Sequence, residues 1–352
     1  MFTKFCSCSP FAAIPTKGGG GAIHHTLHLR WGHASACERW ERDTKGPRVR
    51  ERESNANLNL LSVLSTVGTV SKHALKKGKK IKLEKKDYLL IPYPFIAFLV
   101  GLIDGDGYIQ ITRTTKGFIA IKLTICLSLQ DISTLEYIRS VLKLGKITIY
   151  RDYKNPICKL IINKTDLQEV IFPLLIHHGI YFLTNNRRTQ FDLAMFIFKN
   201  DLKLFEKIPN KDIPTIFQLP KTALDYLNLA FFNNWFVGFT NAEGSFFIKN
   251  NNDGCFQLKQ KIHIHLFEAF KLLFNTKRNI SIEKGKFMQF SLSSKTDIQK
   301  VINFFSFSGF HPLIGLKNIQ YFKWLTNLQN SHRYKILNFP LSVSLKSTNK
   351  LE

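Results

Sequence analysis

The sequence predicts an α+β protein built from two pseudo-symmetric α-β-β-α-β-β-α repeats, each with one antiparallel sheet. Three observations lead to this class. The stretch "LVGLIDGDG" (99–107) has a looser counterpart in "FVGFTNAEG" (236–244). After each stretch, segments of alternating and of helical periodicity recur in the same order. Finally, "KTDLQ" (164–168) and "KTDIQ" (295–299) are nearly identical and occupy the same place in the two copies.

The first repeat is predicted to span residues 88–200. An apolar helix runs into the first stretch, and "YIQITRT" and "GFIAIKLTICLSL" then alternate as two strands of a hairpin. The segment "DISTLEYIRSVL" has helical spacing, "GKITIYRD" and "PICKLIIN" are strand-like, and "KTDLQEVIFPLLIHHG" is a helix ending at Gly179. The four strands should form one sheet with helices on one face, which leaves the other face for a ligand.

The second repeat is predicted to span residues 233–340 and follows the same order. Its first hairpin is "SFFIKN" with "CFQLKQKIHIHL", then come the helix "FEAFKLLF", the hairpin "NISIEKGKFMQFSLS" and a helix in "KTDIQKVINFFSFSG". Residues 201–232 form the linker, in which "EKIPNKDIPTIFQLPKT" carries three prolines. Residues 341–352 are a tail. Residues 1–87 are rich in Gly, Arg and His without apolar periodicity, so we expect a low-complexity, disordered extension.

The charge balance indicates a polyanionic partner. Lysine and arginine number 50 against 25 acids, which gives a net charge of +25, with +10 in residues 1–88 and +15 in residues 89–352. Because the excess is not confined to one end, nucleic acid is a better explanation than a basic tail, although a basic surface kept for solubility is the alternative. No cysteine pair has the C-x-x-C spacing of a zinc site. No apolar run reaches the roughly 18 residues of a membrane span, so no membrane partner is expected.

The small residues of the two stretches predict two closely packed helices. Gly101 and Gly105 lie four residues apart, as do Gly238 and Ala242, so each pair shares one helix face. Small residues at this spacing allow helix backbones to approach closely, by the steric argument known from membrane helices. Close packing would bring together the acids that end the two helices.

Each stretch ends in an acid followed by glycine, at Asp106 and Glu243. Two adjacent carboxylates repel each other unless cations lie between them. Oxygen ligands beside phosphate suit Mg²⁺ or another divalent cation, and such ions assist phosphodiester hydrolysis. The alternative is that these acids only terminate helices and shape turns. Asp104 corresponds to Asn241, and an amide in place of a carboxylate favours a structural role at that position.

The chain resembles the LAGLIDADG homing endonucleases. "LVGLIDGDG" differs from the family signature at two positions, both by small residues, and "FVGFTNAEG" keeps its frame. The resemblance covers residues 89–338 and implies that the two sheets form a DNA-binding saddle. It also implies that Asp106 and Glu243 bind metal, because the last acid before the terminal glycine does so in the family. Gln130 and His265, at matching strand ends, would hold the water network, and Arg187 and Lys317 would stabilise phosphate charge. The alternatives are a solvated strand end for the first pair and cations that only position a phosphate for the second.

The strand alternation predicts a recognition face. Side chains that point away from the helices are rich in Gln, Lys, Asn and Thr, which suits base reading in the major groove, although an ordinary solvated face is the alternative. The predicted nucleic-acid-binding residues are Gln110, Thr112, Thr114, Lys122, Thr124, Ser245, Lys249, Asn251, Gln257, Lys259, Lys261 and His263. Unlike halves in one chain predict an asymmetric target.

These features together predict a monomeric, metal-dependent endonuclease that cuts both strands of double-stranded DNA at a long asymmetric site. The alternative on the same fold is an intron maturase, which would bind intron RNA and assist its splicing. A DNA-binding protein without chemistry would require both acids to be incidental. The resemblance implies a protein encoded in an organellar intron, in the mitochondrion or, alternatively, the chloroplast.

Overall fold

A computed structural model describes residues 83–210 and 213–341 of the chain. The extension predicted for residues 1–87 lies outside the described residues up to residue 82, and so does the tail beyond residue 341. A short helix, α2 (Lys85–Tyr88), precedes the first repeat, so helical structure begins a few residues before the predicted boundary. None of the helices described in these two ranges is long and apolar enough to cross a membrane.

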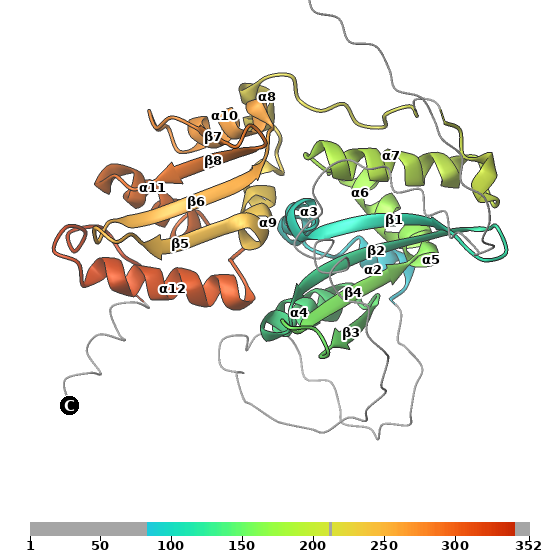
Figure 1. Ribbon diagram of the computed structural model, residues 1–352, viewed down its shortest axis with the longest axis horizontal. Helices are drawn as coiled ribbons and strands as arrows, with labels where there is room; N and C mark the ends of the chain where they lie inside the picture. Colours follow the sequence, from blue (N-terminus) through green and yellow to red (C-terminus); the bar gives the residue numbers. More distant parts are fainter. Residues whose placement is uncertain (1–82, 211–212, 342–352) are drawn as a thin grey trace, which may run out of the picture. The chain divides into compact units, whose positions relative to one another are not determined.

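The predicted fold class is confirmed. Each repeat contains one four-stranded antiparallel sheet, and its helices and strands follow one another in the predicted order. The first sheet has the strand order β1-β2-β4-β3 and the second has the order β5-β6-β8-β7. Figure 1 shows the first sheet in teal and green and the second in yellow and orange. The first repeat contains α3 (Tyr93–Asp106), β1 (Gly107–Arg113), β2 (Ile119–Ser128), the 3-10 turn η1 (Leu129–Asp131), α4 (Ile132–Leu142), β3 (Lys146–Tyr150), β4 (Ile157–Asn163), α5 (Lys164–Asp166), the π-helical turn η2 (Leu167–Ile171), α6 (Phe172–His177) and α7 (Asn185–Lys199).

The connection between the repeats contains the 3-10 turn η3 (Phe205–Lys207) and the helix α8 (Ala223–Leu227). The second repeat contains α9 (Phe232–Glu243), β5 (Gly244–Ile248), β6 (Gly254–Lys261), α10 (Ile264–Leu273), β7 (Ser281–Glu283), β8 (Phe287–Leu292), α11 (Lys295–Ser306) and α12 (Gly315–Gln329). The end of β6 and the start of α10 differ from the prediction. The segment "IHIHL" continues the alternating pattern of β6, but the strand ends at Lys261 and Ile264 already begins α10.

Each repeat ends in a further long helix that the pattern analysis did not assign, α7 in the first repeat and α12 in the second. In α7 the residues at positions 191, 194 and 197 are buried, which is the spacing of one helix face. The polar start "NNRRTQ" conceals this face in the sequence. The extra helix matters for the site, because its first turn carries the basic residue predicted in each repeat.

The helices α3 and α9 lie side by side near the centre of Figure 1. Their backbones are in direct contact at two glycines. A Cβ atom added to Gly101 would lie 1.9 Å from the Trp235 carbonyl oxygen. A Cβ added to Gly238 would lie 1.9 Å from the Phe98 carbonyl oxygen. Only glycine fits at these two crossing positions, since real Cβ atoms do not approach other atoms so closely.

One apolar core extends through both repeats and surrounds this helix pair. Phe236 packs against Phe270, Phe274 and Phe304 in the second repeat, with ring centroids 5.0–5.6 Å apart. A smaller cluster of Tyr108 and Ile157, with neighbouring tyrosines, lies on strands of the first sheet outside that core. Because Ile109 points into the main core, the adjacent Tyr108 lies on the opposite face of the sheet.

Candidate functional site

The two predicted acids lie at the paired ends of α3 and α9. Asp106 is the last residue of α3, and Glu243 is the last residue of α9. A Cβ added to Gly105 would lie 3.2 Å from Glu243 Cγ and 3.6 Å from its Oε1, so the Glu243 carboxylate contacts the end of α3. Burial and then the Glu243 charge raise the pKa of Asp106 well above its ordinary value. The geometry therefore brings two partly exposed carboxylates together.

A cation from each repeat lies beside this pair. Arg187, in the first turn of α7, is buried, and its Nε donates to the Ile103 carbonyl oxygen at 3.2 Å. Lys317, in the first turn of α12, donates through Nζ to the Gly244 carbonyl oxygen. Both positive charges oppose the rise in the pKa of Asp106. Burial lowers the pKa of Lys317 from its ordinary value, against the attraction of the nearby acids.

Two glutamines accompany these cations and were missed in the sequence. Gln190 Oε1 accepts from Arg187 Nη1 at 3.3 Å and from the Ile109 backbone N–H at 3.0 Å. Gln320 holds the equivalent position beside Lys317, and its buried Oε1 has no hydrogen-bond partner in the described part of the chain. Both glutamines follow a cation by three residues, in "RRTQ" and "LKNIQ", so the repeated spacing was a signal available in the sequence.

The surroundings of Glu243 differ from those of Asp106. Gln260 Nε2 donates to Glu243 Oε1 at 2.8 Å. The strand register pairs Gly107 with Ile125 and Gly244 with Leu258, so the counterpart of Gln260 in the first repeat is the apolar Leu127. The amide partner of one acid is therefore missing for the other.

The Asp106 side instead contains a third carboxylate, Asp131. Its Oδ1 accepts from the Leu316 backbone N–H at 2.9 Å and from Thr134 Oγ1 at 2.8 Å. The hydrogen bond from Leu316 joins η1 of the first repeat to the start of α12 in the second. A cavity of about 350 Å³ opens at this junction. Its lining consists of Asp106, Leu127, Ser128, Asp131, Asn241, Ala242, Leu316, Lys317 and Gln320.

The pairing predicted for Gln130 and His265 is wrong in register. Counting from the strand pairs above, the residue equivalent to Gln130 is His263. Gln130 is exposed in η1, beside the Asp131 that lines the cavity. His265 is exposed on α10, and its Nδ1 lies 3.5 Å from Glu268 Oε2. The error arose because β6 ends at Lys261, earlier than the alternating pattern suggested.

Asp104 and Asn241 act as acceptors for the loops before α7 and α12. Asp104 accepts from the backbone N–H groups of Leu183 and Thr184 at 2.8 and 3.2 Å, and from Trp235 Nε1 at 2.8 Å. Asn241 Oδ1 accepts from the Ile314 backbone N–H at 2.9 Å. Burial, opposed by these hydrogen bonds, raises the pKa of Asp104 to about 6. Asp104 and Asn241 therefore both fix neighbouring loops through hydrogen bonds, a role that an amide can fill as well as a carboxylate.

Most predicted recognition residues have accessible side chains, but Thr124 does not, and the partly exposed His263 lies outside the strands of the sheet. Thr124 is 1 % exposed, so it is not available to a ligand. His263 lies beyond the end of β6, where its Nε2 is 3.4 Å from the Tyr226 hydroxyl. Thr114 and Asn251 are exposed at hairpin ends, and the others are partly exposed: Gln110, Thr112, Lys122, Ser245, Lys249, Gln257, Lys259 and Lys261.

The second sheet connects its recognition residues in a polar ladder. Ser291 Oγ donates to Gln257 Oε1 at 3.4 Å, and Gln289 Nε2 donates to Ser291 Oγ at 3.3 Å. Lys249 Nζ donates to Ser293 Oγ at 3.4 Å on the same strand edge. The residues of β8 were not among the predicted recognition residues, because the faces of that strand were not assigned from the sequence.

Comparisons with known proteins agree with this arrangement. A family model described as "LAGLIDADG endonuclease" matches residues 99–208 and 236–328, and so covers both repeats. The chain is 28% identical to "Probable intron-encoded endonuclease aI3" of Kluyveromyces lactis, over 64% of this chain and 63% of that protein. It is also 28% identical to "Uncharacterized cox1 intron-2 37.2 kDa protein" of Schizosaccharomyces pombe, with the same shares. The chain thus spans less than two thirds of the length of either relative.

Among solved structures, the fold is similar to I-SmaMI bound to an uncleaved DNA target in the presence of calcium ions. The TM-score is 0.51 at 16% identity, over 73% of this chain and 93% of that one.

Proposed function

Because the chain belongs to the LAGLIDADG endonuclease family, we propose that it is a homing endonuclease that hydrolyses both strands of a long, asymmetric DNA site with a divalent metal. The observation that carries this proposal is the meeting of Asp106 and Glu243 at the paired ends of α3 and α9. Both carboxylates are only partly exposed; two such groups side by side repel each other, and bound cations relieve that repulsion.

The donor set fits Mg²⁺. This ion is commonly held by one or two carboxylates together with water and substrate phosphates, rather than by a closed protein cage. Within residues 83–210 and 213–341, no group of three or more His, Cys, Asp or Glu side chains is arranged to hold a metal, so no closed cage competes with this pair. Asp106 and Glu243 would hold the metal. When bound, it would supply positive charge that acidifies water and neutralises the phosphate.

The remaining residues of the site would position groups and compensate charge. Hydrolysis adds water to a backbone phosphorus and releases one ester oxygen, and negative charge grows on the phosphate oxygens. Arg187 is buried and Lys317 is partly buried, and both cations lie beside the acids, where they would stabilise this charge. Gln260 would orient Glu243 through its 2.8 Å hydrogen bond. Asp131 would hold the first turn of α12, and hence Lys317, at the Asp106 side.

The recognition surface supports an asymmetric DNA target. The first sheet presents threonines and Gln110, whereas the second presents lysines and a glutamine–serine ladder. Lysine suits guanine and glutamine suits adenine in the major groove, so the two sheets would read different half-sites. One chain carries both repeats, and we infer that it acts as a monomer.

The maturase alternative, with intron RNA as the ligand, is not favoured by the names of the relatives, since the chain's match in Kluyveromyces lactis is called an endonuclease. The intron-encoded names, one of them a cox1 intron protein, support a mitochondrial location over the chloroplast.

The experiment that tests the proposal uses plasmid DNA carrying the intron-free sequence into which the gene's own intron inserts. Purified full-length protein with Mg²⁺ should linearise this plasmid and leave a plasmid with the intron-interrupted sequence intact. A parallel assay should measure splicing of the intron RNA. Splicing assistance without cleavage of the intron-free plasmid would replace the proposal with the maturase.

A further inference from the structure

A basic hollow lies in the second repeat, away from the paired acids. It has a volume of about 480 Å³, between the loop 274–280 and the first turns of α11. Its lining consists of Asn275, Thr276, Lys277, Arg278, Asp297 and Lys300. Three cations face one acid, so the hollow has an excess of positive charge. We refer to these six residues as the basic hollow.

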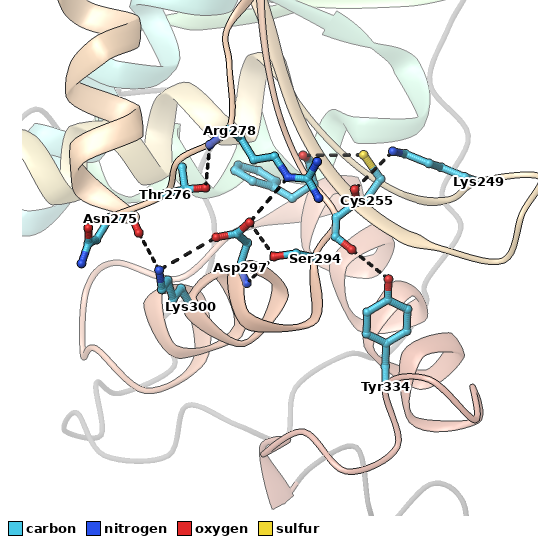
Figure 2. Close-up of polar contacts among 11 residues, drawn as sticks. Lys249, Cys255, Asn275, Thr276, Arg278, Ser294, Asp297, Lys300 and Tyr334 are labelled. Carbon is cyan, nitrogen blue, oxygen red and sulfur yellow. Dashed lines mark hydrogen bonds and ion pairs between the residues drawn. The ribbon is translucent and has the colours of Figure 1, made fainter.

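Asp297 holds two of the cations in place, as Figure 2 shows. Arg278 Nε lies 3.9 Å from Asp297 Oδ2, and Lys300 Nζ lies 3.9 Å from Oδ1. Lys300 Nζ also donates to the Asn275 carbonyl oxygen at 2.6 Å, which fixes it against the loop. Both ion pairs are at the long limit of such contacts. The Arg278 side chain is 51% exposed and that of Lys300 is 34% exposed, so both keep donors for a ligand from solvent.

Within the basic hollow, Asp297 has a structural role that an acid in the first repeat shares. Asp297 accepts from Ser294 Oγ, and its backbone N–H donates back to that oxygen, which caps α11. Asp166 makes the equivalent cap with Asn163 in the first repeat. The acid is therefore explained by helix capping in both copies.

The cations have no such explanation, because the first repeat lacks them. "KTDLQE" aligns with "KTDIQK", so Glu169 stands where the second repeat has Lys300. The loop between the preceding helix and strand spans residues 143–145 in the first repeat and residues 274–280 in the second. The longer loop is the segment that brings Lys277 and Arg278 to the hollow. A charge reversal and a loop extension thus coincide at one place in one repeat.

We propose that the basic hollow binds a backbone phosphate of the DNA, outside the bases read by the sheet. The loop 274–280 leads directly into β7, the edge strand next to β8 and its Gln289. A duplex lying on this sheet would pass the edge strand β7, where the loop ends. Arginine and lysine donors that remain open to solvent suit one phosphate of a polymer better than an enclosed small molecule. The proposal rests on the proposed function only for the identity of DNA as the ligand.

The test is the salt dependence of binding to a random-sequence DNA duplex, which needs no knowledge of the target. The variant Arg278→Ala/Lys300→Ala should reduce the slope of log Kd against log salt concentration by about 0.9, the contribution of the one phosphate contact that it removes. The matched control is Lys323→Ala/Lys335→Ala, which removes the same charge from exposed residues of the second repeat outside the hollow. Thermal unfolding of all three proteins checks that folding is retained.

An equal change of slope in the two double variants would overturn the proposal, since it would then reflect net charge alone. The same assay with single-stranded RNA tests whether the hollow binds RNA instead of DNA. If the double variant Arg278→Ala/Lys300→Ala lowers the slope for RNA but not for DNA, the proposal is also overturned. If the wild-type protein binds duplex with a steep slope but cuts no target, the nuclease proposal fails while the hollow is still tested.

Discussion

Substituting alanine for the glycines between α3 and α9 tests how far the site depends on the contact of the two helix backbones. In Gly105→Ala the new methyl group would lie 2.3 Å from the Ala242 Cβ, more than 1 Å inside an ordinary contact. In Gly101→Ala it would lie 1.9 Å from a backbone oxygen, which no side-chain rotation can relieve. Overpacking of a rigid core costs about 1–3 kcal/mol, and we expect Gly101→Ala at or above the upper end.

The two substitutions differ in whether they can be rescued. Ala242→Gly removes the methyl that opposes Gly105→Ala, so the double variant should recover most of the lost free energy of unfolding. Ala242→Gly alone should cost about 1 kcal/mol through helix propensity. The same change should not rescue Gly101→Ala, whose obstacle is the Trp235 backbone.

Denaturant unfolding of the three single variants and of the two double variants that contain Ala242→Gly measures these differences as double-mutant cycles. Additive effects of Gly105→Ala and Ala242→Gly, or a Gly101→Ala protein as stable as the wild type, would refute the proposed packing.

Three further predictions concern the surroundings of the paired acids and the recognition face. Asp104→Asn should cost about 1–3 kcal/mol of stability, because one amide oxygen cannot accept all the donors that the carboxylate accepts, while DNA cleavage persists. Since burial raises the Asp104 pKa from 3.8 to about 6, the folded state holds this proton more tightly. The stabilisation is therefore full below pH 3.8 and is lost as the pH rises through 6, and Asp104→Asn should flatten this part of the unfolding profile. Asp131→Asn should slow the nicking of one strand more than the other, because only the Asp106 half contains this acid; equal slowing on supercoiled target would contradict its role. Lys249→Ala and Gln110→Ala should each relax base preference in a single half-site by about 1–3 kcal/mol, and uniform weakening in target profiling would make them phosphate contacts instead.

The sequence was sufficient wherever a local pattern determines the structure. Alternation and helical spacing repeat in both halves, so the two sheets and their order could be predicted. The spacing of Gly101 with Gly105 encodes a small helix face, and the acid before each terminal glycine marks the helix end. These features depend on neighbours within one or two helical turns, and periodicity reports such neighbours directly.

The sequence was insufficient where contacts join distant segments. Asp131 bonds to the backbone of Leu316, 185 residues away, and no local pattern indicates that contact. Gln260 could be assigned to the site only once the strand register was known. The end of β6 was also misplaced, so that the residue matched to Gln130 was His265, two residues beyond the true equivalent His263. Alternation placed Thr124 on the face opposite the helices, where it pairs with Tyr108, but it cannot tell that this part of the face is covered.

The most direct test of the central claim is to remove the charge from each paired acid without changing its size. Asp106→Asn and Glu243→Gln keep the helix packing through the glycines, but each loses a negative oxygen donor for a metal. The expected result is that cleavage of the intron-free target in Mg²⁺ falls by orders of magnitude in both variants. Specific binding to that target should persist or strengthen, because a carboxylate beside the phosphates is gone. Cleavage by both variants at the wild-type rate, with binding unchanged, would contradict the account.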